Sequence, residues 1–314
     1  MNRFCRALVP LLILLFVVFP ATAKQSRQKK PHCHTYPSLL GCSDPVLQQG
    51  LESCVADLGL EDAVRDKSLC VALVDITDLN APRLAALNGD EMKYAASLPK
   101  IALLLGAFEK SAQGDLELDE KTCDTLTCMI RNSSNSAATQ ILNRIGADYL
   151  AGLLQSPRYR LYDRERNGGL WVGKEYGRGP AWKRDPLHNI SHGATALQVA
   201  RFYYLLETGR LVSPEKSRQM KEMLGRTAIQ HKFVKGLAQA KPGSAIYRKS
   251  GTWRQFHADS AIIERDNHRY IAVALAENPQ GGDWLTRLII GMDDLIFQTA
   301  SGPVRLSRLR ETSR

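Results

Sequence analysis

Three short polar strings contain the residue types that nucleophilic catalysis needs. In chain order they are Ser-Leu-Pro-Lys at 97–100, Ser-Ser-Asn at 133–135 and Lys-Ser-Gly-Thr at 249–252. On a helix, residues three apart share a face, so the Lys100 amine can reach the Ser97 hydroxyl. Burial, together with a second cation such as Lys249, would lower the pKa of Lys100 and let it act as a base. A serine activated in this way can attack a carbonyl carbon.

The pattern Ser-x-x-Lys occurs three times, and its context separates the copies. Ser26 lies in a basic tail, and Ser213 precedes Pro214, which is typical of a helix N-cap. Ser97 instead opens the apolar run 101–108, which predicts a helix in the middle of a domain. Standing alone, the string at 97–100 would indicate only a serine at a helix start with a lysine whose stem is buried. The other two strings favour the catalytic interpretation.

Together, the three strings resemble the S-x-x-K, S-x-N and K-[ST]-G signature of serine β-lactamases and penicillin-binding proteins. Ser97 precedes Ser133 by 36 residues and Lys249 by 152, which is similar to the spacing in class A β-lactamases. The resemblance covers the chain from about Gly50 to about Ala300. It implies an α+β fold of the β-lactamase/transpeptidase type, in which helices flank an antiparallel sheet and an all-helical lobe is inserted.

The resemblance also implies a role for each motif residue. Ser97 would form an acyl-enzyme, Lys100 would activate it, and Ser133 would relay a proton to the leaving nitrogen. The backbone amides of Ser97 and Thr252 would form the oxyanion hole. Substrate binding would fall to Asn135, Lys249, Ser250, Gly251 and Thr252, and Gly251 would let the substrate lie close to a strand. Without the other strings, local helix capping would explain Ser133 and Asn135 better.

The chain departs from the class A pattern in three places. Ser134 stands where aspartate is usual, and Ser250 where threonine is frequent. The loop from 157 to 192 lacks the Glu-x-x-x-Asn pattern whose glutamate activates the deacylating water. Glu165 and Glu175 lie at plausible distances along the chain, yet a loop glutamate is more often simply solvated. We therefore expect acylation by the Ser-Lys pair, followed by poor hydrolysis of a penicilloyl ester.

Three functions fit these residues. The first is an exported serine hydrolase of the class A β-lactamase type, acting on a β-lactam or a related amide or ester. The second is a D-Ala-D-Ala carboxypeptidase or transpeptidase acting on peptidoglycan, and the third is a sensor that binds β-lactams or wall fragments without turnover. We expect no cofactor, no metal and a monomer. Fold and motifs do not fix the substrate.

The N-terminus predicts export. Residues 1–23 carry Arg3 and Arg6, an apolar stretch at 7–19 and Ala-Thr-Ala at 21–23, which is the pattern of a signal peptide cleaved near Ala23. An uncleaved anchor is the alternative, but the apolar stretch is short for a membrane span. We expect a periplasmic or secreted protein without a stable membrane anchor. The net charge of +10 indicates a solvated basic surface, and no motif points to nucleic acid.

Six cysteines remain after the predicted cleavage, and an even number in an exported chain favours disulfides. Their connectivity is open, and proximity in sequence suggests these pairs: Cys33 with Cys42, Cys54 with Cys70, and Cys123 with Cys128. The run His32-Cys33-His34 could be mistaken for a metal site, but its spacing fits no common zinc pattern.

Periodicity predicts the elements that position the motifs. We expect an exposed tail at 24–45 and one catalytic domain at 46–300, with a sheet lobe from 46–96 and 210–300, a helical lobe from 97–209 and a second tail at 301–314. Strands are predicted at 70–76, 83–88, 245–253, 258–264 and 270–276, and helices at 46–64 and 284–299. The loop at 157–192 should cross the mouth of the site. His188, His192 and His257 could help with proton transfer, although structural histidines are more common, and Trp253 and Arg254 should border the entrance of the site.

Overall fold

The structure, a computed structural model, describes residues 36–300, which lie in one compact unit. The predicted signal peptide, most of the first tail, Cys33 and residues 301–314 lie outside the described residues. The longer helices are α1 (Pro45–Asp57), α3 (Lys100–Ala112), α4 (Glu120–Arg131), α5 (Asn135–Ile145), α6 (Ala147–Gln155), α7 (Ala196–Glu207), α8 (Pro214–Leu224), α9 (Phe233–Ala240) and α10 (Gly281–Ala300). Short helical segments are η1 (Leu39–Gly41), α2 (Glu61–Arg65) and η2 (Arg164–Arg166).

A five-stranded antiparallel sheet forms the framework, in the order β2-β1-β10-β9-β8. Its strands are β1 (Leu69–Asp75), β2 (Arg83–Leu87), β8 (Ala245–Trp253), β9 (Phe256–Arg265) and β10 (His268–Glu277). Strand β8 has the predicted bounds. The turn between β9 and β10 lies at Asp266 and Asn267, which both have positive φ, as a tight two-residue hairpin requires.

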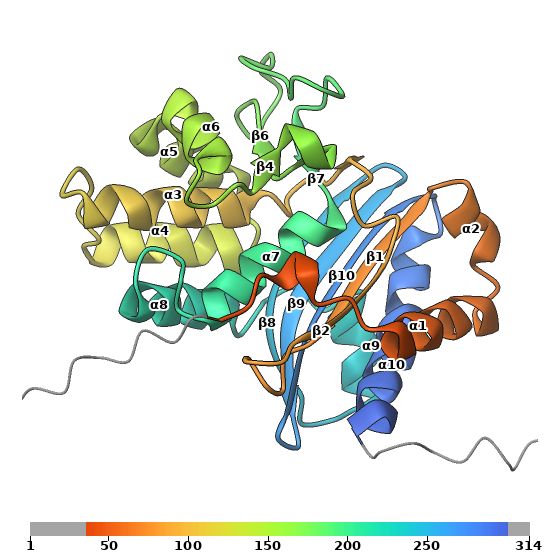
Figure 1. Ribbon diagram of the computed structural model, residues 1–314. Helices are drawn as coiled ribbons and strands as arrows, with labels where there is room; N and C mark the ends of the chain where they lie inside the picture. The colour runs from red at the N-terminus through yellow and green to blue at the C-terminus, as the bar shows by residue number, and fades with distance from the viewer. Residues whose placement is uncertain (1–35, 301–314) are drawn as a thin grey trace, which may run out of the picture. The chain divides into compact units, whose positions relative to one another are not determined.

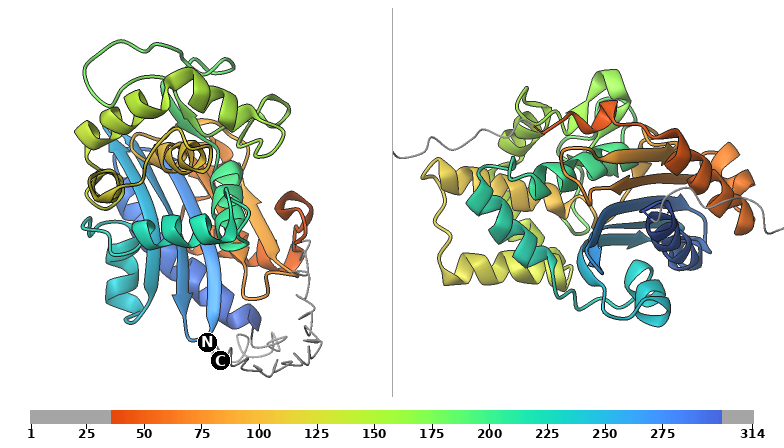
Figure 2. Two further views of the ribbon diagram at one scale, coloured as in Figure 1. Left: turned by 90° about the vertical axis from the view of Figure 1, so that its left-hand side faces the viewer. Right: turned by 60° about the horizontal axis from the view of Figure 1, so that its bottom comes forward.

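Helices cover both faces of the sheet (Figures 1 and 2). Helices α1, α9 and α10 pack on one face, and α7 packs on the other and joins the sheet to the helical layer of α3–α6. Strand β1 is buried along its whole length because it lies inside this sandwich. The α+β class with an antiparallel sheet is therefore confirmed. Helix α8 contacts α4 and α7 as well as β8.

Short strands link the sheet to the site. They are β3 (Lys93–Tyr94), β4 (Tyr162–Asp163), β5 (Gly168–Gly169), β6 (Trp171–Val172) and β7 (His192–Ala194). Strand β7 pairs with both β3 and β6, so part of the predicted loop at 157–192 is structured. The Ala95 amide donates to the His192 carbonyl at 2.9 Å and extends this pairing to within two residues of Ser97.

Two expectations about the N-terminal part were wrong. Residues 36–44 are not an exposed tail, because Leu39 is buried against α7 and the Asp44 amide donates to the Leu84 carbonyl at 2.9 Å. The expected helix over 46–64 divides into α1 and α2. Gly59 adopts a left-handed conformation between them, which a continuous helix cannot contain.

The predicted disulfides are absent between the cysteines that the structure describes, where Cys42, Cys54, Cys70, Cys123 and Cys128 are free thiols. Cys54 packs with the core on the α10 side of the sheet, whereas Cys70 belongs to the core on the α7 side. Cys123 and Cys128 lie five residues apart on α4, which separates their Cα atoms by about 9 Å, while a disulfide requires about 4–7 Å. The pairing of Cys33 with Cys42 involves a residue outside the described range.

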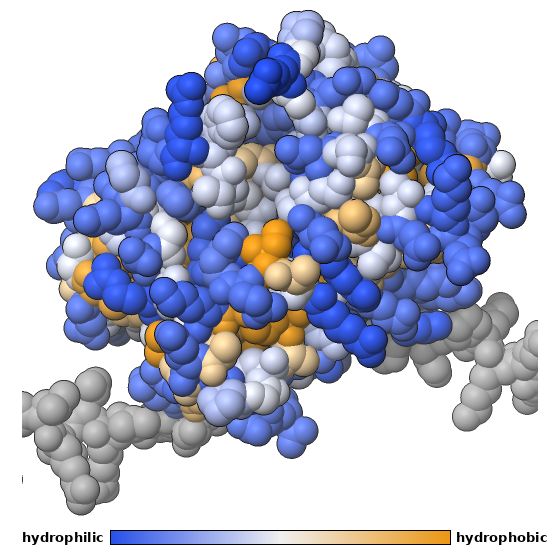
Figure 3. Space-filling model, turned by 180° about the vertical axis from the view of Figure 1, so that it is seen from behind, coloured by the Kyte–Doolittle hydropathy of each residue, from blue (hydrophilic) through white to orange (hydrophobic). Residues whose placement is uncertain are grey.

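Within residues 36–300, no helix has both the length and the apolar character needed to cross a membrane. The described residues also contain no cluster of three or more His, Cys, Asp or Glu side chains suited to a metal ion. The face seen from behind in Figure 3 is mostly hydrophilic, and its main apolar patch lies near the middle of the lower half of the view.

Candidate active site

Ser97 lies on the turn that leads into α3. The helix begins at Lys100 rather than at Ser97, and Ala96 just before Ser97 has a left-handed φ of 51°. Leu98 and Ile101 are fully buried and fix this turn in the core. The side chain of Ser97 is therefore presented by a sharp turn whose flanking residues cannot move freely.

The Lys100 amine is the centre of the polar network. It lies 3.1 Å from the Ser97 hydroxyl, 2.8 Å from the Asn135 side-chain oxygen and 2.6 Å from the Ser133 carbonyl. Lys100 is completely buried, and all of these partners are neutral oxygens. Burial lowers its pKa to about 7 because a charged amine loses its hydration there.

Ser133 joins the two lysines of the motifs. Its hydroxyl accepts a hydrogen bond from the Lys249 amine at 2.8 Å and lies 3.4 Å from the Lys100 amine. Ser133 adopts a left-handed φ of 57° between α4 and α5, which is uncommon for a residue other than glycine. Helix capping is performed by Ser134, which accepts from the Ala137 amide. Capping therefore explains Ser134 but neither Ser133 nor Asn135.

The two amines meet at the Ser133 hydroxyl, and Lys100 is the one that also contacts the Ser97 hydroxyl. Lys249 is almost fully buried, and its other contact is the Ser250 carbonyl at 2.8 Å. Burial, with the Lys100 amine as a further cause, lowers the pKa of Lys249 well below its ordinary value. Since two buried cations so close together repel each other, the pair favours a state with at least one neutral amine.

Gly251 is required by the close approach of β8 to the Ser97 turn. A Cβ atom there would overlap the Ala95 carbonyl oxygen and lie 2.8 Å from the Ser97 amide nitrogen and 2.9 Å from that of Leu98. The close neighbour is thus the protein's own backbone, whereas the sequence reading had assigned this space to substrate. The arrangement brings the third motif beside the Ser97 amide.

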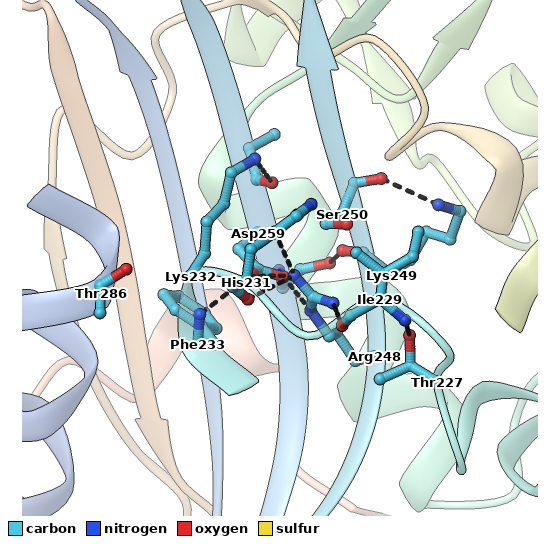
Figure 4. Close-up of polar contacts among 12 residues, drawn as sticks. Thr227, Ile229, His231, Lys232, Phe233, Arg248, Lys249, Ser250, Asp259 and Thr286 are labelled. Carbon is cyan, nitrogen blue, oxygen red and sulfur yellow. Dashed lines mark hydrogen bonds and ion pairs between the residues drawn. The ribbon is translucent and has the colours of Figure 1, made fainter. Parts of the chain in front are cut away.

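Two buried groups behind β8 were not found from the sequence (Figure 4). The Lys232 amine donates to the carbonyls of Gly251 and Ala258, at 2.6 and 3.0 Å, and to the Thr252 hydroxyl at 2.9 Å. Its pKa is lowered to about 8, mainly by burial. Arg248 forms a two-point ion pair with Asp259, at 2.8 and 2.7 Å.

The Arg248–Asp259 pair had a usable sequence signal. Both residues occupy the predicted β8–β9 hairpin, where Arg248 pairs with Ala261 and Ser250 with Asp259. Diagonal neighbours two positions apart on one face of a hairpin lie within reach of long side chains. Lys232 has no such signal, because it precedes α9 in a segment without period.

A cleft of about 830 Å³ opens over Ser97. Ser97, Asn135 and Thr252 line it, whereas Lys100, Ser133, Lys249 and Ser250 lie behind these residues and are not part of its wall. The predicted loop contributes much of the remaining wall through residues 174–181 and 189–192. Trp253 lines the mouth and is half exposed, as expected for a residue at the entrance.

The structure places neither candidate glutamate in contact with the reacting groups. Glu165 lies in a separate surface hollow, where it pairs with Arg160 at 3.1 Å. Glu175 is exposed on the wall of the cleft, and no hydrogen bond joins its carboxylate to Ser97 or Lys100. Among the described residues, no carboxylate bonds to either group. Of the two candidates, only Glu175 shares the cleft with Ser97.

Two aromatic side chains, Tyr176 and His192, lie together in the wall of the cleft near Lys100. The Tyr176 ring lies 4.6 Å from the Lys100 amine and 4.3 Å from the His192 ring. His192 is buried, its pKa is lowered to about 4 mainly by burial, and it lines the cleft. His188 and His257 are not among the lining residues: His188 contacts the Asn167 carbonyl, and His257 lies against the start of α10.

A comparison of sequences identifies the family of the chain. Residues 122–291, just over half of the chain, match the sequence model of the beta-lactamase enzyme family. The matched segment contains Ser133 and Lys249 and begins after Ser97. A comparison with curated proteins found no match.

The fold resembles several solved structures. A mutant of PBP-A, as an acyl-enzyme complex with penicillin G, has 19% identity and a TM-score of 0.61, with coverage of 82% of this chain and 98% of that one. A beta-lactamase from Sphaerobacter thermophilus has 18% identity and a TM-score of 0.61, covering 82% and 98%. A class A beta-lactamase representative from Bacteroides cellulosilyticus has 14% identity and a TM-score of 0.63, covering 83% and 100%. The chain therefore belongs to the beta-lactamase enzyme family, and its fold is similar to those of class A β-lactamases and of PBP-A.

Proposed function

We propose that this protein is an exported serine hydrolase that forms an acyl-enzyme on Ser97 with β-lactams or related amides and esters, and that it releases the acyl group slowly. The proposal is carried by one observation, the 3.1 Å approach of the buried Lys100 amine to the Ser97 hydroxyl. Membership of the beta-lactamase enzyme family supports the reaction class.

Acylation follows from the contacts around Ser97. Neutral Lys100 accepts the Ser97 proton as the hydroxyl oxygen bonds to the carbonyl carbon. The negative charge that develops on the carbonyl oxygen is stabilised by the Ser97 and Thr252 amides. Ser133 then donates its proton to the leaving nitrogen and is reprotonated through the amines of Lys100 and Lys249. The hydrogen bonds that join Ser133 to both lysines support this relay.

Substrate binding would use the polar groups at the cleft wall. The Asn135 oxygen accepts from Lys100, which leaves the Asn135 amide hydrogens to donate to a substrate carbonyl. The Thr252 hydroxyl accepts from Lys232, so its own proton is available for a substrate carboxylate. Lys249 and Ser250 lie behind the wall of the cleft. They would act on that carboxylate electrostatically and through Ser133 rather than by direct contact.

Slow release follows from the lack of a base for water. Hydrolysis of the ester needs a group that takes a proton from the attacking water, and in the described residues no carboxylate bonds to Ser97 or Lys100. Of the second function, a D-Ala-D-Ala carboxypeptidase or transpeptidase, this feature favours the transpeptidase, because a long-lived acyl group can be passed to an amine instead of to water. A sensor that retains the acyl group would share this chemistry.

Intact mass spectrometry after mixing with penicillin G separates these functions. We expect an adduct that persists for many minutes, whereas a transient adduct would indicate an efficient β-lactamase. Release of D-alanine from a peptide ending in D-Ala-D-Ala would identify the peptidase, and a persistent adduct without that release would identify the sensor. The absence of an adduct with any β-lactam would contradict the proposal.

Export is part of the proposal and has its own test. Residues 1–23 should be removed near Ala23, so the mature protein should begin at Lys24 and be found in the periplasm or the medium. N-terminal sequencing of the fractionated protein would show this. A full-length protein in the membrane fraction would instead support the uncleaved anchor.

A further inference from the structure

Tyr176 is the buried residue of an exposed stretch. Its neighbours Glu175 and Gly177 are exposed, while Tyr176 itself is only 9% exposed. Its amide donates to the Thr139 hydroxyl on α5 at 3.1 Å, which ties the stretch to the helical layer. Its ring also packs on the His192 ring of β7. The chain thus turns one aromatic side chain inward, toward the Ser97–Lys100 pair.

The Tyr176 hydroxyl has no hydrogen-bond partner among the described residues, although the oxygen is out of contact with solvent. A buried hydroxyl without a partner is unfavourable, and phenylalanine would fill the same space without that cost. Burial raises the pKa of Tyr176 well above its usual value, so the phenol stays neutral. The ring therefore contributes neither a charge nor a proton acceptor to the amine that it covers.

We propose that Tyr176 is a positioning residue that covers the Lys100 amine, keeping it out of water as the base for acylation and keeping water away from acylated Ser97. This inference rests on the proposed function and adds a second cause, exclusion of water, for its slow release step. The ring lies 4.6 Å from the amine, and Tyr176, Ser97 and Asn135 line the same cleft.

The titratable groups that face Lys100 make the consequence testable. Lys249 faces it from β8, His192 from β7 and Tyr176 from the loop, with Tyr94 on β3 beyond Tyr176. An aromatic face attracts a cation and would raise the pKa of Lys100, whereas removing water lowers it. Burial is the cause that lowers the pKa of Lys100, so we expect the pKa to rise when the cover is removed and water enters.

The experiment compares Tyr176→Ala and Tyr176→Phe with the unaltered protein. The rate of acylation by a fluorescent penicillin is measured from about pH 5 to about pH 10, and adduct lifetime by intact mass. In Tyr176→Ala we expect the midpoint of the pH profile to rise by at least about one unit, which lowers the rate at pH 7 about fivefold. We expect the adduct to be lost roughly ten times faster as water enters. Tyr176→Phe keeps the ring and should match the unaltered protein in both measurements.

The chain offers a matched control in Tyr149 on α6, whose ring lies 4.3 Å from the Lys110 amine on the protein surface. Tyr149→Ala removes the same kind of contact away from the cleft and should change neither the pH midpoint nor the lifetime. Should Tyr176→Ala fail to fold, Tyr176→Leu keeps apolar bulk but covers less of the Lys100 amine. The pH midpoint should then rise and the adduct lifetime should shorten, both by less than in Tyr176→Ala.

The outcomes separate the inference from the proposed function. If the unaltered protein forms no adduct, the proposed function fails. If the unaltered protein forms an adduct, but Tyr176→Ala keeps the same pH midpoint and the same adduct lifetime, the inference about Tyr176 is overturned and the proposed function stands. Equal defects in Tyr176→Phe and Tyr176→Ala would also overturn it, because the hydroxyl rather than the cover would then matter.

Discussion

A methyl group at position 251 would push β8 away from the Ser97 turn. In Gly251→Ala, the new Cβ would overlap the Ala95 carbonyl oxygen and lie 2.8 Å from the Ser97 amide nitrogen. These neighbours are backbone atoms, which cannot swing aside as a flexible side chain can. The strand or the turn must therefore move, and both belong to the site.

The size of the effect follows from the overlap. Restoring ordinary contact requires a displacement of about 1 Å. Overpacking in a core commonly costs about 1–3 kcal/mol, and the rigid neighbours place this variant at about 3 kcal/mol. That loss corresponds to a fall in Tm of about 6–12 °C for a chain of this size. A displacement of about 1 Å at reacting groups lowers the rate about 100-fold, so acylation should fall by that factor.

Calorimetry and the rate of adduct formation with penicillin G measure the two effects. The matched control is Gly152→Ala in α6, where a Cβ would meet nothing within 4 Å. Alanine is favoured over glycine inside a helix by about 0.5–1 kcal/mol, so this control should be slightly more stable and fully active. A Gly251→Ala protein with unchanged Tm and acylation rate would refute the geometry given for the third motif.

Three further predictions concern buried charges and thiols. Asp259→Asn leaves Arg248 in a buried site without its counter-charge, so the free energy of unfolding measured in urea should fall by about 3–5 kcal/mol; a loss below about 1 kcal/mol would contradict the burial of the pair. Because the base must be neutral, the acylation rate should rise about tenfold per pH unit below the Lys100 pKa of about 7 and level off above it, and a rate independent of pH would speak against Lys100 as the base. Replacing Cys123 and Cys128 with serine should shift Tm by less than about 2 °C, because both are free thiols. If they formed a disulfide, its loss would lower the free energy of unfolding by about 2–5 kcal/mol, and Tm would fall clearly.

Local signals in the sequence predicted much of the framework. The strand at 245–253 has the predicted bounds, and the hairpin turn at Asp266 and Asn267 follows rules that act within a few residues. Ser213 caps α8 as expected, by accepting from the amide of Lys216. The motif at 97–100 was predictable for the same reason. Ser97 and Lys100 are three residues apart on one turn of the chain, and this spacing brings the hydroxyl and the amine together.

The parts that escaped prediction depend on contacts between distant segments. Tyr176 reaches Lys100 only because its stretch is tied to α5, and Lys232 reaches Gly251 only because α9 follows it behind the sheet. The cysteine pairs failed for a related reason, since neighbours in sequence can lie on opposite faces of a sheet. The glutamate question was similar: position in the loop could not show that Glu165 faces a different hollow.

Ser97 is the group that the proposed function requires to be acylated. After reaction with penicillin G and digestion with trypsin, the peptide Tyr94–Lys100 contains Ser97 and a single other hydroxyl, that of Tyr94. We predict that the penicilloyl mass is carried by this peptide on Ser97, and that Ser97→Ala forms no adduct. An adduct on another peptide, or one that persists in Ser97→Ala, would contradict the assignment of the nucleophile.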